Sequence, residues 1–219
     1  MQDDPVDKKF LRRKLRAERQ ALSDAWVQQW SQAISQRLQS MWVVASASRV
    51  AAYMAMDREV DVVTGEGGAW LADKKLYLPK VMERQMVFVP YQRGEPLQQG
   101  AYGILEPQIG DKKCLSGLDI GHLDLLVVPL VGFDGTGTRL GYGGGYFDRL
   151  LAPWNPSLAG EMVETNAARP LLIGVAYSFQ EVAFLPREKH DFCLDYVVTE
   201  KGIHHFSGPS SGNQRFPVQ

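Results

Sequence analysis

The first 41 residues place their large apolar side chains on one helical face. These side chains recur mostly three, four or seven positions apart, which is the spacing of an amphipathic helix; they are Phe10, Leu11, Leu15, Leu22, Trp26, Trp30, Ile34 and Leu38. Ser23 and Asp24 can begin a second helix, because a side-chain oxygen at a helix N-terminus accepts a hydrogen bond from an unpaired backbone amide. The pattern predicts one or two helices over residues 5–41, with a break near residue 23.

Short apolar runs replace this pattern in the rest of the chain. They are rich in Val, Ile, Leu and Tyr, which is typical of strands buried on both faces; the runs are Arg49–Met54, Lys75–Pro79, Met86–Pro90, Leu123–Leu130, Leu171–Tyr177 and Tyr196–Thr199. Helical stretches are expected at Val60–Lys74, where three glycines interrupt the pattern, and at Tyr146–Trp154. Strands that alternate with helices predict an α/β fold with a mostly parallel sheet covered on both faces.

Length and composition narrow the class of protein. A chain of 219 residues suits one domain, which we expect at residues 1–202, with a mobile C-terminal tail at 203–219 and a surface excursion at Ser157–Ala168. The 24 Lys+Arg nearly balance the 25 Asp+Glu, so no overall field attracts nucleic acid or an anionic membrane. Cys114 and Cys193 match no metal-ligand spacing and are expected to be reduced thiols. With charged first residues and no apolar run of about 20 residues, the sequence predicts a soluble cytoplasmic protein.

The segment after Leu123–Leu130 is the most informative about chemistry. It has seven glycines in the fourteen positions from Gly132 to Gly145, and a backbone free of Cβ atoms can turn its amides towards a phosphate. Clusters of glycine also form hairpin turns and flexible loops, so the count alone leaves both interpretations open. Arg139 and Asp148 favour phosphate, because arginine binds phosphate oxygens and a carboxylate beside phosphates holds Mg²⁺. The segment matches neither the Rossmann nor the P-loop pattern.

A run of basic residues near the N-terminus also has two interpretations. Six of the nine residues 8–16 are Lys or Arg, and a solvated helix face is the ordinary explanation of such a run. Lys8 and Arg12 are four positions apart on one helical face, so both could reach a polyphosphate if this helix packs beside the glycine segment. Spatial proximity would decide between the two.

Three other places are open in the same way. Met54 and Glu59 follow a predicted strand; they could line a pocket with an apolar wall and a carboxylate, or lead into a helix whose first turn carries acids. Tyr102 lies between two glycines, either as a loop anchor or as a stacking surface for a planar ligand. Asp191 precedes the last predicted strand and could approach the glycine segment and its metal, or cap a turn.

In their order and spacing, these segments resemble the 5-formyltetrahydrofolate cyclo-ligase family, also called 5,10-methenyltetrahydrofolate synthetase. The resemblance covers about residues 8 to 201, and the glycine segment is its most specific part. The segments that carry it are Lys8–Arg12, Met54 with Glu59, Tyr102–Pro107, Pro129–Arg149, and His190 and Asp191 with Asp195.

The resemblance implies a three-layer α/β/α fold and an ATP- and Mg²⁺-dependent conversion of 5-formyltetrahydrofolate to 5,10-methenyltetrahydrofolate, ADP and phosphate. In that reaction the formyl oxygen attacks the γ-phosphate, and N10 of the folate then closes the ring as phosphate leaves. Phosphoryl transfer needs positioning and charge neutralisation more than a side-chain nucleophile. The cations, amides and acids of this sequence agree with that requirement.

Site roles follow from the resemblance position by position. Lys8, Arg12 and Arg139 would act on the ATP phosphates as catalytic residues. The ATP-binding set would be Lys8, Lys9, Phe10, Leu11, Arg12, Arg139, Leu140, Gly141, Tyr142, Gly143, Gly144, Gly145, Tyr146 and Phe147. The folate-binding set would be Met54, Glu59, Tyr102 and Tyr146, and the Mg²⁺ ligands would be Asp148 and Asp191.

The chain departs from the family pattern at two positions. Phe147 stands where a second tyrosine is usual, which removes a hydroxyl, and Gly144 stands where some members carry a lysine, so that a phosphate contact would come from elsewhere, such as Arg149. The expected substrate is a reduced folate with or without a polyglutamate tail, and the expected assembly is a monomer or a weak homodimer. Two rival functions on the same fold are a non-catalytic binder of folate or nucleotide and a phosphotransferase for a small metabolite.

Overall fold

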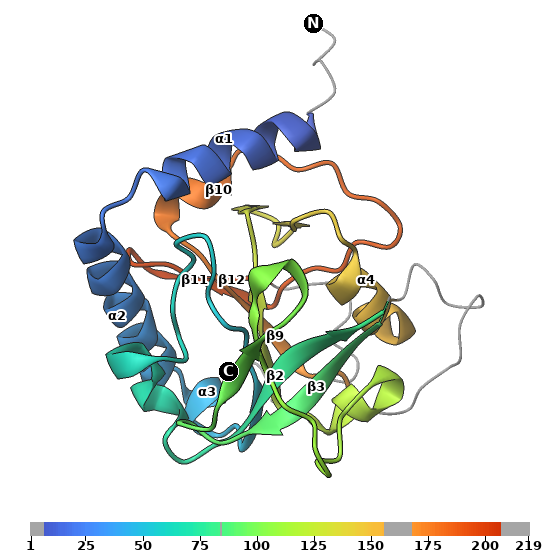
Figure 1. Cartoon of the computed structure of the whole chain (residues 1–219). Coiled ribbons are helices and arrows are strands. Elements are labelled where there is room, and N and C mark those ends of the chain that lie inside the picture. The colour runs from blue at the N-terminus through green and yellow to red at the C-terminus, as the bar shows by residue number, and fades with distance from the viewer. Residues whose placement is uncertain (1–6, 84, 156–167, 207–219) are drawn as a thin grey trace, which may run out of the picture.

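A seven-stranded sheet forms the centre of the molecule (Figure 1). The computed structural model describes residues 7–83, 85–155 and 168–206 of the chain. The strands lie in the order β12, β11, β9, β6, β1, β2, β3. Their bounds are β1 Arg49–Ala51, β2 Lys75–Met82, β3 Gln85–Tyr91, β6 Leu125–Pro129, β9 Leu171–Val175, β11 Tyr196–Val198 and β12 Ile203–His205.

The sheet is mostly parallel. β1 pairs in parallel with β2 and β6, and β9 does so with β6 and β11, whereas the edge strands β3 and β12 run antiparallel to their neighbours. Each of the six apolar runs overlaps one strand of this sheet, so the predicted strands and the predicted α/β fold are confirmed. Parallel neighbours require long crossover connections, and these connections carry the helices that cover the sheet.

Elements from the first half of the chain cover one face of the sheet. They are α2 (Asp24–Ser40), α3 (Trp42–Ala45) and the 3₁₀ segment η1 (Gly65–Leu71). Ile34 and Leu38 of α2 and Trp70 of η1 pack in one buried cluster with Val50 and Val127 of the sheet. Helix α2 is thereby packed against strands β1 and β6 of the sheet.

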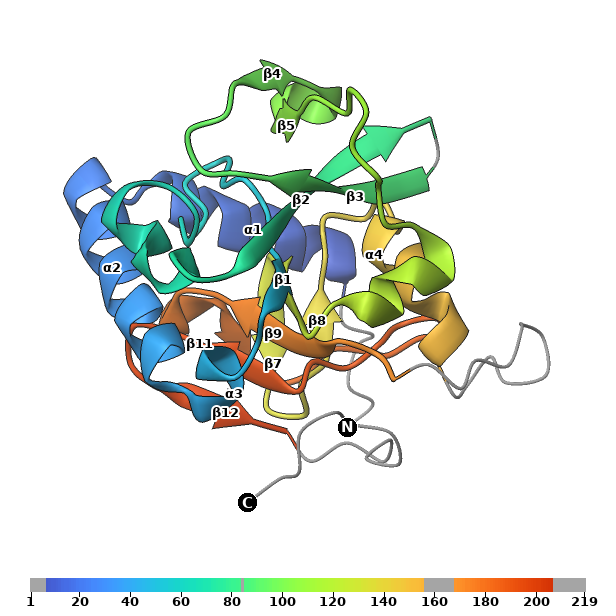
Figure 2. The ribbon, with the colours of Figure 1, turned by 90° about the horizontal axis from the view of Figure 1, so that it is seen from below.

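The opposite face is covered by α4 (Tyr146–Leu151) and η3 (Gly117–His122) (Figure 2). Leu150 and Ile120 pack in a second cluster with Ala51, Leu126 and Leu172. Neighbouring residues of each strand therefore alternate between the two clusters, which explains why the central strands are apolar at nearly every position. The three-layer architecture follows from burial of both faces.

The break predicted near residue 23 is confirmed. α1 spans Lys8–Gln20 and α2 begins at Asp24. The Ser23 hydroxyl accepts a hydrogen bond of 3.2 Å from the Trp26 amide, as expected of an N-cap. The helix expected over Val60–Lys74 is replaced by the shorter 3₁₀ segment η1. It does not begin earlier because the Asp61 carboxylate accepts hydrogen bonds from the amides of residues 63 and 64, which form a bend there.

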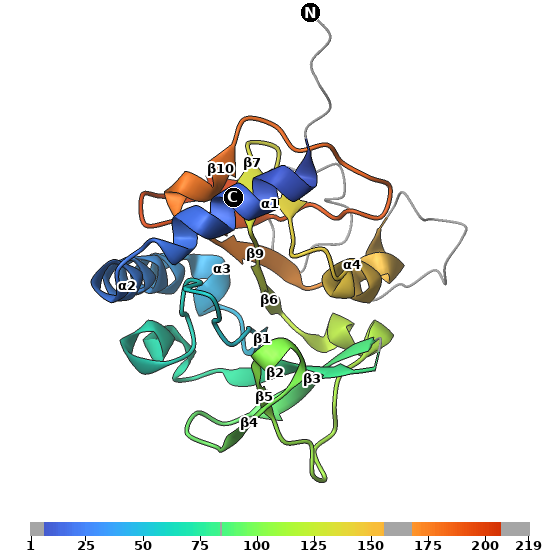
Figure 3. The same ribbon diagram turned by 45° about the horizontal axis from the view of Figure 1, so that its top comes forward.

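The glycine segment divides into two structures. Its first half forms the hairpin of β7 (Gly132–Asp134) and β8 (Arg139–Leu140), which pairs with β10 (Glu181–Val182) in a small separate sheet. Helix α1 lies across this sheet (Figure 3), because Leu15 packs against Val131, Leu140 and Leu185. The second half, residues 141–145, is the loop that leads into α4. The glycines therefore serve a hairpin in the first half and a loop in the second, and the phosphate cradle stays a prediction.

A hairpin of β4 (Leu97–Gln99) and β5 (Leu105–Pro107), joined by η2 (Ala101–Gly103), stands beside β2. Tyr102 at its tip and the segment Tyr102–Pro107, which contains β5, were noted in the sequence, but the hairpin itself was not predicted. Ile203–His205, expected in the tail, pair with β11 as β12, and residues 207–219 lie outside the described residues, as does all but the last residue of Ser157–Ala168. Among the residues described, no helix is both long and apolar enough to cross a membrane. The assignment of residues 1–202 to a single domain stays a prediction.

Candidate active site

A cavity of about 370 Å³ opens where β1 and β6 end. Open α/β sheets bind their ligands at this place, beyond the carboxyl ends of parallel strands. The sequence segments that surround it come from α1, β2, β3, the β4–β5 hairpin and the start of α4. The residues that line it are Arg16, Tyr53, Met54, Met56, Glu59, Pro79, Val81, Met86, Tyr102, Ile104, Glu106, Pro129, Arg139, residues 141–147 and Asp148.

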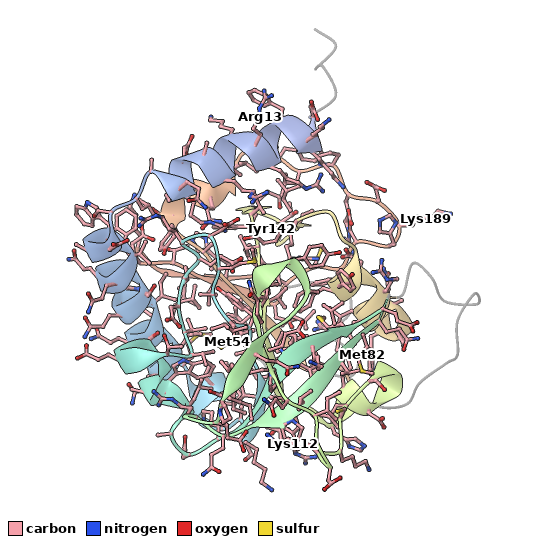
Figure 4. The ribbon with its side chains drawn as sticks, viewed as in Figure 1. Arg13, Met54, Met82, Lys112, Tyr142 and Lys189 are labelled. Atoms are coloured by element: carbon pink, nitrogen blue, oxygen red, sulfur yellow. The ribbon has the colours of Figure 1, made fainter. Side chains whose placement is uncertain are left out.

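The predicted folate residues share this cavity. Met54 and Glu59 are both buried in its wall, on the segment that leaves β1. Figure 4 labels Met54 in the interior of the molecule and Tyr142 between it and α1. The pocket interpretation of Met54 and Glu59 is therefore favoured over an acidic helix start, since no helix begins there.

The Glu59 carboxylate is held by contacts from three directions. It accepts hydrogen bonds from the Tyr142 hydroxyl and, at 3.0 Å, from the Met56 amide, and Nη1 of Arg19 lies 3.8 Å from its Oε1 atom. Burial raises the pKa of Glu59, although Arg19 and both hydrogen bonds oppose that rise. A buried carboxylate of this kind suits a ligand that brings hydrogen-bond donors of its own.

Arg139 lies on the other side of the cavity, at the start of β8. Its Nη2 atom is 3.1 Å from Oδ1 of Asp148, and its guanidinium carbon lies 5.6 Å and 4.8 Å from the ring centroids of Phe147 and Phe192. Burial lowers the pKa of Arg139 and Asp148 opposes that change, but an arginine remains charged in any case. The departure at Phe147 therefore has a structural role that needs no hydroxyl, because its ring supports Arg139.

The basic end of α1 reaches the glycine loop, which settles the question of proximity. Nε of Arg12 donates a hydrogen bond of 2.8 Å to the Gly141 carbonyl. Nζ of Lys8 lies 3.2 Å from Oδ2 of Asp191 and 3.0 Å from Glu188. Partial burial opposes the charge on Lys8, but these hydrogen bonds outweigh it and raise the pKa of the ammonium group. Cations and acids thus gather at one end of the loop.

Backbone conformation explains the glycines of the loop itself. Gly143 has φ +98° and Gly145 has φ +67°, both in the region that side chains disfavour. At Gly144, a Cβ atom would stand 3.1 Å from the Tyr146 ring. The guanidinium carbon of Arg149 lies 4.8 Å from the centre of that ring, so Arg149 is beside the loop where it was expected.

Two tyrosines stand at the mouth of the cavity. The Tyr102 and Tyr146 hydroxyls lie 3.1 Å apart, and their ring centroids are 6.2 Å apart. Tyr102 is 69% exposed and has φ +56°, so its ring does not anchor the hairpin by burial. The geometry favours a surface on which a planar molecule can pack.

Six of the predicted ATP residues do not line the cavity: Lys8, Lys9, Phe10, Leu11, Arg12 and Leu140. Lys8 and Arg12 make the contacts with Asp191, Glu188 and Gly141 given above. Phe10 is exposed and lies under the guanidinium of Arg13, which Figure 4 labels on the outer side of α1. Lys9 is exposed as well, and Leu11 and Leu140 pack in the cluster beneath α1. For Lys9, Phe10, Leu11 and Leu140, only backbone contacts and packing remain as expected contributions to ATP binding.

The sequence interpretation missed three charged groups of the cavity region, one of which is Arg16 in the cavity lining. Arg19 is 2% exposed, and its position between Leu15 and Leu22 on the apolar face of the first helix is the signal that could have found it. Glu106 is buried in the cavity wall, where it binds Lys80 at 3.3 Å and the Val81 amide at 3.1 Å. Glu106 belongs to the segment Tyr102–Pro107, which carries part of the family resemblance, but nothing in the local sequence indicated that its side chain would be buried.

An aromatic-walled cavity on one side of a glycine loop, with cations on the other side, is typical of α/β enzymes that bring a small organic substrate to a nucleotide. Comparison with known proteins gives the particular family. The sequence model of the 5-formyltetrahydrofolate cyclo-ligase family matches residues 4–200. The chain therefore belongs to the 5-formyltetrahydrofolate cyclo-ligase family.

Individual relatives agree with the family match. The chain is 32% identical to the 5-formyltetrahydrofolate cyclo-ligase of Haemophilus influenzae, over 83% of this chain and 90% of the relative. It is 31% identical to the enzyme of the same name from Escherichia coli, over 86% and 98%. The solved structure of Aquifex aeolicus 5,10-methenyltetrahydrofolate synthetase superposes with a TM-score of 0.74 at 30% identity, over 97% of this chain and 99% of that one.

Proposed function

We propose that this chain catalyses the ATP-dependent conversion of 5-formyltetrahydrofolate to 5,10-methenyltetrahydrofolate, with release of ADP and phosphate. Membership of the cyclo-ligase family supports the activity and the use of ATP. One observation from the structure carries the proposal: Glu59 and Arg139, from distant parts of the sequence, line the same cavity on either side of the glycine loop. Two substrates can therefore meet there.

The reaction begins when the formyl oxygen of the folate attacks the γ-phosphorus of ATP, and ADP departs. The resulting phosphorylated imidate is attacked at its carbon by N10, the C–O bond to phosphate breaks, and N10 loses its proton as the methenyl bridge forms. No step uses a nucleophile of the protein. The protein contributes orientation and stabilisation of developing negative charge, which are the usual terms in phosphoryl transfer.

The folate is assigned to the half of the cavity near β1. Glu59 accepts hydrogen bonds from the donor edge of the pterin ring, and Met54 forms an apolar wall against that ring. Tyr102 and Tyr146 pack on the planar part of the substrate at the mouth of the cavity. Their exposed hydroxyl pair and the 69% exposure of Tyr102 leave ring surface available for this contact.

ATP is assigned to the half near α1 and α4. Arg139, Arg12 and Lys8 bind its phosphates, together with the amides of residues 140–147, and Arg149 supplies the contact that Gly144 cannot. Arg12 contacts the loop at the Gly141 carbonyl, and Lys8 contacts Asp191, which supports this assignment. Residues Lys9–Leu11 contribute backbone and packing, since their side chains lie away from the cavity.

A divalent cation, which we propose to be Mg²⁺, fits the acids at this end of the loop. Asp148 and Asp191 both act electrostatically on Arg139, so they face one region from two elements. No group of three or more His, Cys, Asp or Glu residues within the described ranges could hold a metal, which agrees with an ion that takes one or two carboxylates and completes its shell with phosphate and water. When bound, the ion neutralises phosphate charge.

We expect Asp148→Asn to raise the Mg²⁺ concentration for half-maximal rate and to lower kcat, each by at least about ten-fold. The amide keeps the size of the side chain but loses the charge that attracts the cation. Titration of Mg²⁺ at fixed ATP and folate measures both effects. Asp24→Asn is the matched control, because Asp24 is also in the first turn of a helix and pairs with an arginine, Arg58, at 2.6 Å. Unchanged Mg²⁺ dependence of the Asp148 variant would place the ion elsewhere.

The activity itself is tested by mixing the protein with 5-formyltetrahydrofolate, ATP and Mg²⁺ and following the absorbance of the methenyl product. Turnover that requires all three components supports the proposal. Binding of folate or nucleotide without turnover would show a non-catalytic binder, and ATP consumption only with another small metabolite would show a phosphotransferase.

The setting of the enzyme is part of the proposal. We propose that it acts in the cytoplasm as a monomer or weak homodimer, on reduced folates with or without a polyglutamate tail. Cys114 and Cys193 are not paired with each other, which suits a reducing compartment. Sedimentation at two protein concentrations tests the assembly, and comparison of KM for mono- and polyglutamylated substrate tests the tail.

A further inference from the structure

The Tyr142 side chain leaves the glycine loop and points to the carboxylate on the far side of the cavity. Its hydroxyl donates a hydrogen bond to Oε1 of Glu59 and accepts one of 2.5 Å from Nη2 of Arg19. As a member of the loop, Tyr142 was assigned to ATP. Its hydroxyl, however, is bound to the residue assigned to folate.

Arg19 completes this contact from helix α1. The side chain is 2% exposed, and its Nε donates a hydrogen bond of 2.9 Å to the Asp57 carbonyl, two residues before Glu59. Its guanidinium carbon lies 5.6 Å from the centre of the Tyr142 ring, so the ring and the hydroxyl are both held. Arg12, two turns earlier in the same helix, binds the carbonyl of Gly141. Helix α1 therefore contacts the loop at Gly141 and at Tyr142.

A buried carboxylate needs such partners to remain charged and directed. Without them, burial favours the protonated form, and the side chain is free to rotate between hydrogen-bonding partners. Each carboxylate oxygen can accept two hydrogen bonds. The described partners leave acceptor positions on Glu59, which lines the cavity, for a ligand with N–H donors.

We propose that Tyr142 and Arg19 are positioning residues for the folate, which fix the Glu59 carboxylate in the wall of the cavity and join it to the loop that binds ATP. The proposal rests on the function proposed above for Glu59. Because one tyrosine belongs to the nucleotide loop and bonds the folate carboxylate, a loop ordered by nucleotide holds Glu59 better, and the two substrates bind with positive coupling.

The test is Tyr142→Phe, which removes one hydroxyl and keeps the ring. We expect the Kd of 5-formyltetrahydrofolate, measured by calorimetry without nucleotide, to rise about ten-fold, as for loss of a hydrogen bond to a charged group. KM for the folate should rise by a similar factor, with a smaller effect on kcat. In the wild-type protein a non-hydrolysable ATP analogue should tighten folate binding, and the variant should lose most of that gain.

A pH profile separates positioning from mere support of the fold. The charged and titratable groups around Glu59 are Arg19, Tyr142, Asp57, Tyr53 and Tyr177. The pKa of Tyr142 is itself raised by burial, so its hydroxyl stays a donor across the neutral range. Because that hydroxyl lowers the pKa of Glu59, its removal lets Glu59 protonate at higher pH. Folate affinity, which falls as pH falls through this pKa, should therefore begin to fall at higher pH in the variant.

Two further variants make the outcome decisive. Tyr91→Phe removes a tyrosine hydroxyl that binds the Glu95 carbonyl at 3.1 Å outside the cavity, and should leave folate binding unchanged. Glu59→Gln tests the site assignment itself. If Glu59→Gln weakens folate binding but Tyr142→Phe changes Kd by less than about two-fold, the positioning role is wrong and the folate site stands. If neither variant weakens folate binding, the site assignment is wrong, and the positioning role with it.

Discussion

Arg139→Lys is expected to lower kcat/KM for ATP by at least about 100-fold while the protein stays folded. The guanidinium is held between the Phe147 and Phe192 rings and bonds Asp148 at 3.1 Å and the Pro129 carbonyl at 3.4 Å. An arginine presents a planar fork of donors that lysine lacks, and removal of one preorganised donor from a transferring or developing charge commonly costs 10² to 10³ in rate. Lysine keeps a positive charge and an apolar stem, so the loss reports on geometry.

Steady-state kinetics with varied ATP at saturating folate, together with thermal unfolding, measure this effect. Arg93→Lys is the control, because Arg93 is an arginine that binds two backbone carbonyls, those of Gly68 and Gly65, at 2.9 and 3.0 Å away from the cavity. Its kinetics should remain those of the wild type. A variant at Arg139 with full activity towards ATP would show that the nucleotide phosphates bind somewhere else.

Glu59→Gln is expected to raise KM for 5-formyltetrahydrofolate by about 100-fold, with a much smaller rise in KM for ATP that reflects only the lost coupling. The amide presents an N–H group where the pterin offers its own donors, and it removes a charge that strengthens each hydrogen bond. It also leaves the buried Arg19 without its carboxylate partner. The free energy of unfolding should therefore fall by about 3 kcal/mol, and the variant should unfold at a lower temperature.

The pH dependence of folate binding gives a second readout. Burial raises the pKa of Glu59 above its ordinary value, and the ionised form is the one that accepts from the pterin. Wild-type affinity is therefore full above this pKa and declines as pH falls through it. In the glutamine variant nothing titrates at this position, so the decline should disappear.

Asp195→Asn controls for the loss of a buried ion pair. Asp195 bonds Arg169 twice, at 2.6 and 2.7 Å, and also the Leu172 amide at 2.8 Å, outside the cavity. This variant should also unfold at a lower temperature, with KM for the folate unchanged. Equal rises of KM in both variants would mean that lost stability, and no contact with the folate, explains the Glu59 result.

Much of the site could be predicted from local sequence because its chemistry is local. The loop of residues 141–145 needs the backbone freedom of glycine at Gly143 and Gly145, and this need is visible in composition. Arg139 and Asp148 are close to that loop in the sequence. Met54 and Glu59 follow a strand that ends at the ligand-binding edge of the sheet, and this position too is visible in the apolar pattern.

Other features depended on segments that meet only in the folded chain. Local sequence could not assign the β7–β8 hairpin, because β7 also pairs with the distant β10. The burial of Glu106 depends on Lys80 and Val81 of β2, and that of Arg19 depends on residues 57, 59 and 142. Charged residues are called exposed by default because unpaired burial is costly.

Taken by itself, the sequence determined the helix break at Ser23, the six buried runs of the parallel sheet, and the presence of a glycine loop with cations and acids nearby. Periodicity and glycine content report how each residue is buried and how its own backbone bends, and these are properties of neighbours along the chain. Only the tertiary structure decided that helix α1 contacts the loop of residues 141–145 and that the Tyr142 hydroxyl hydrogen-bonds to Glu59. Those contacts join residues 83 to 129 positions apart, and their partners are chosen by packing and charge compensation in three dimensions.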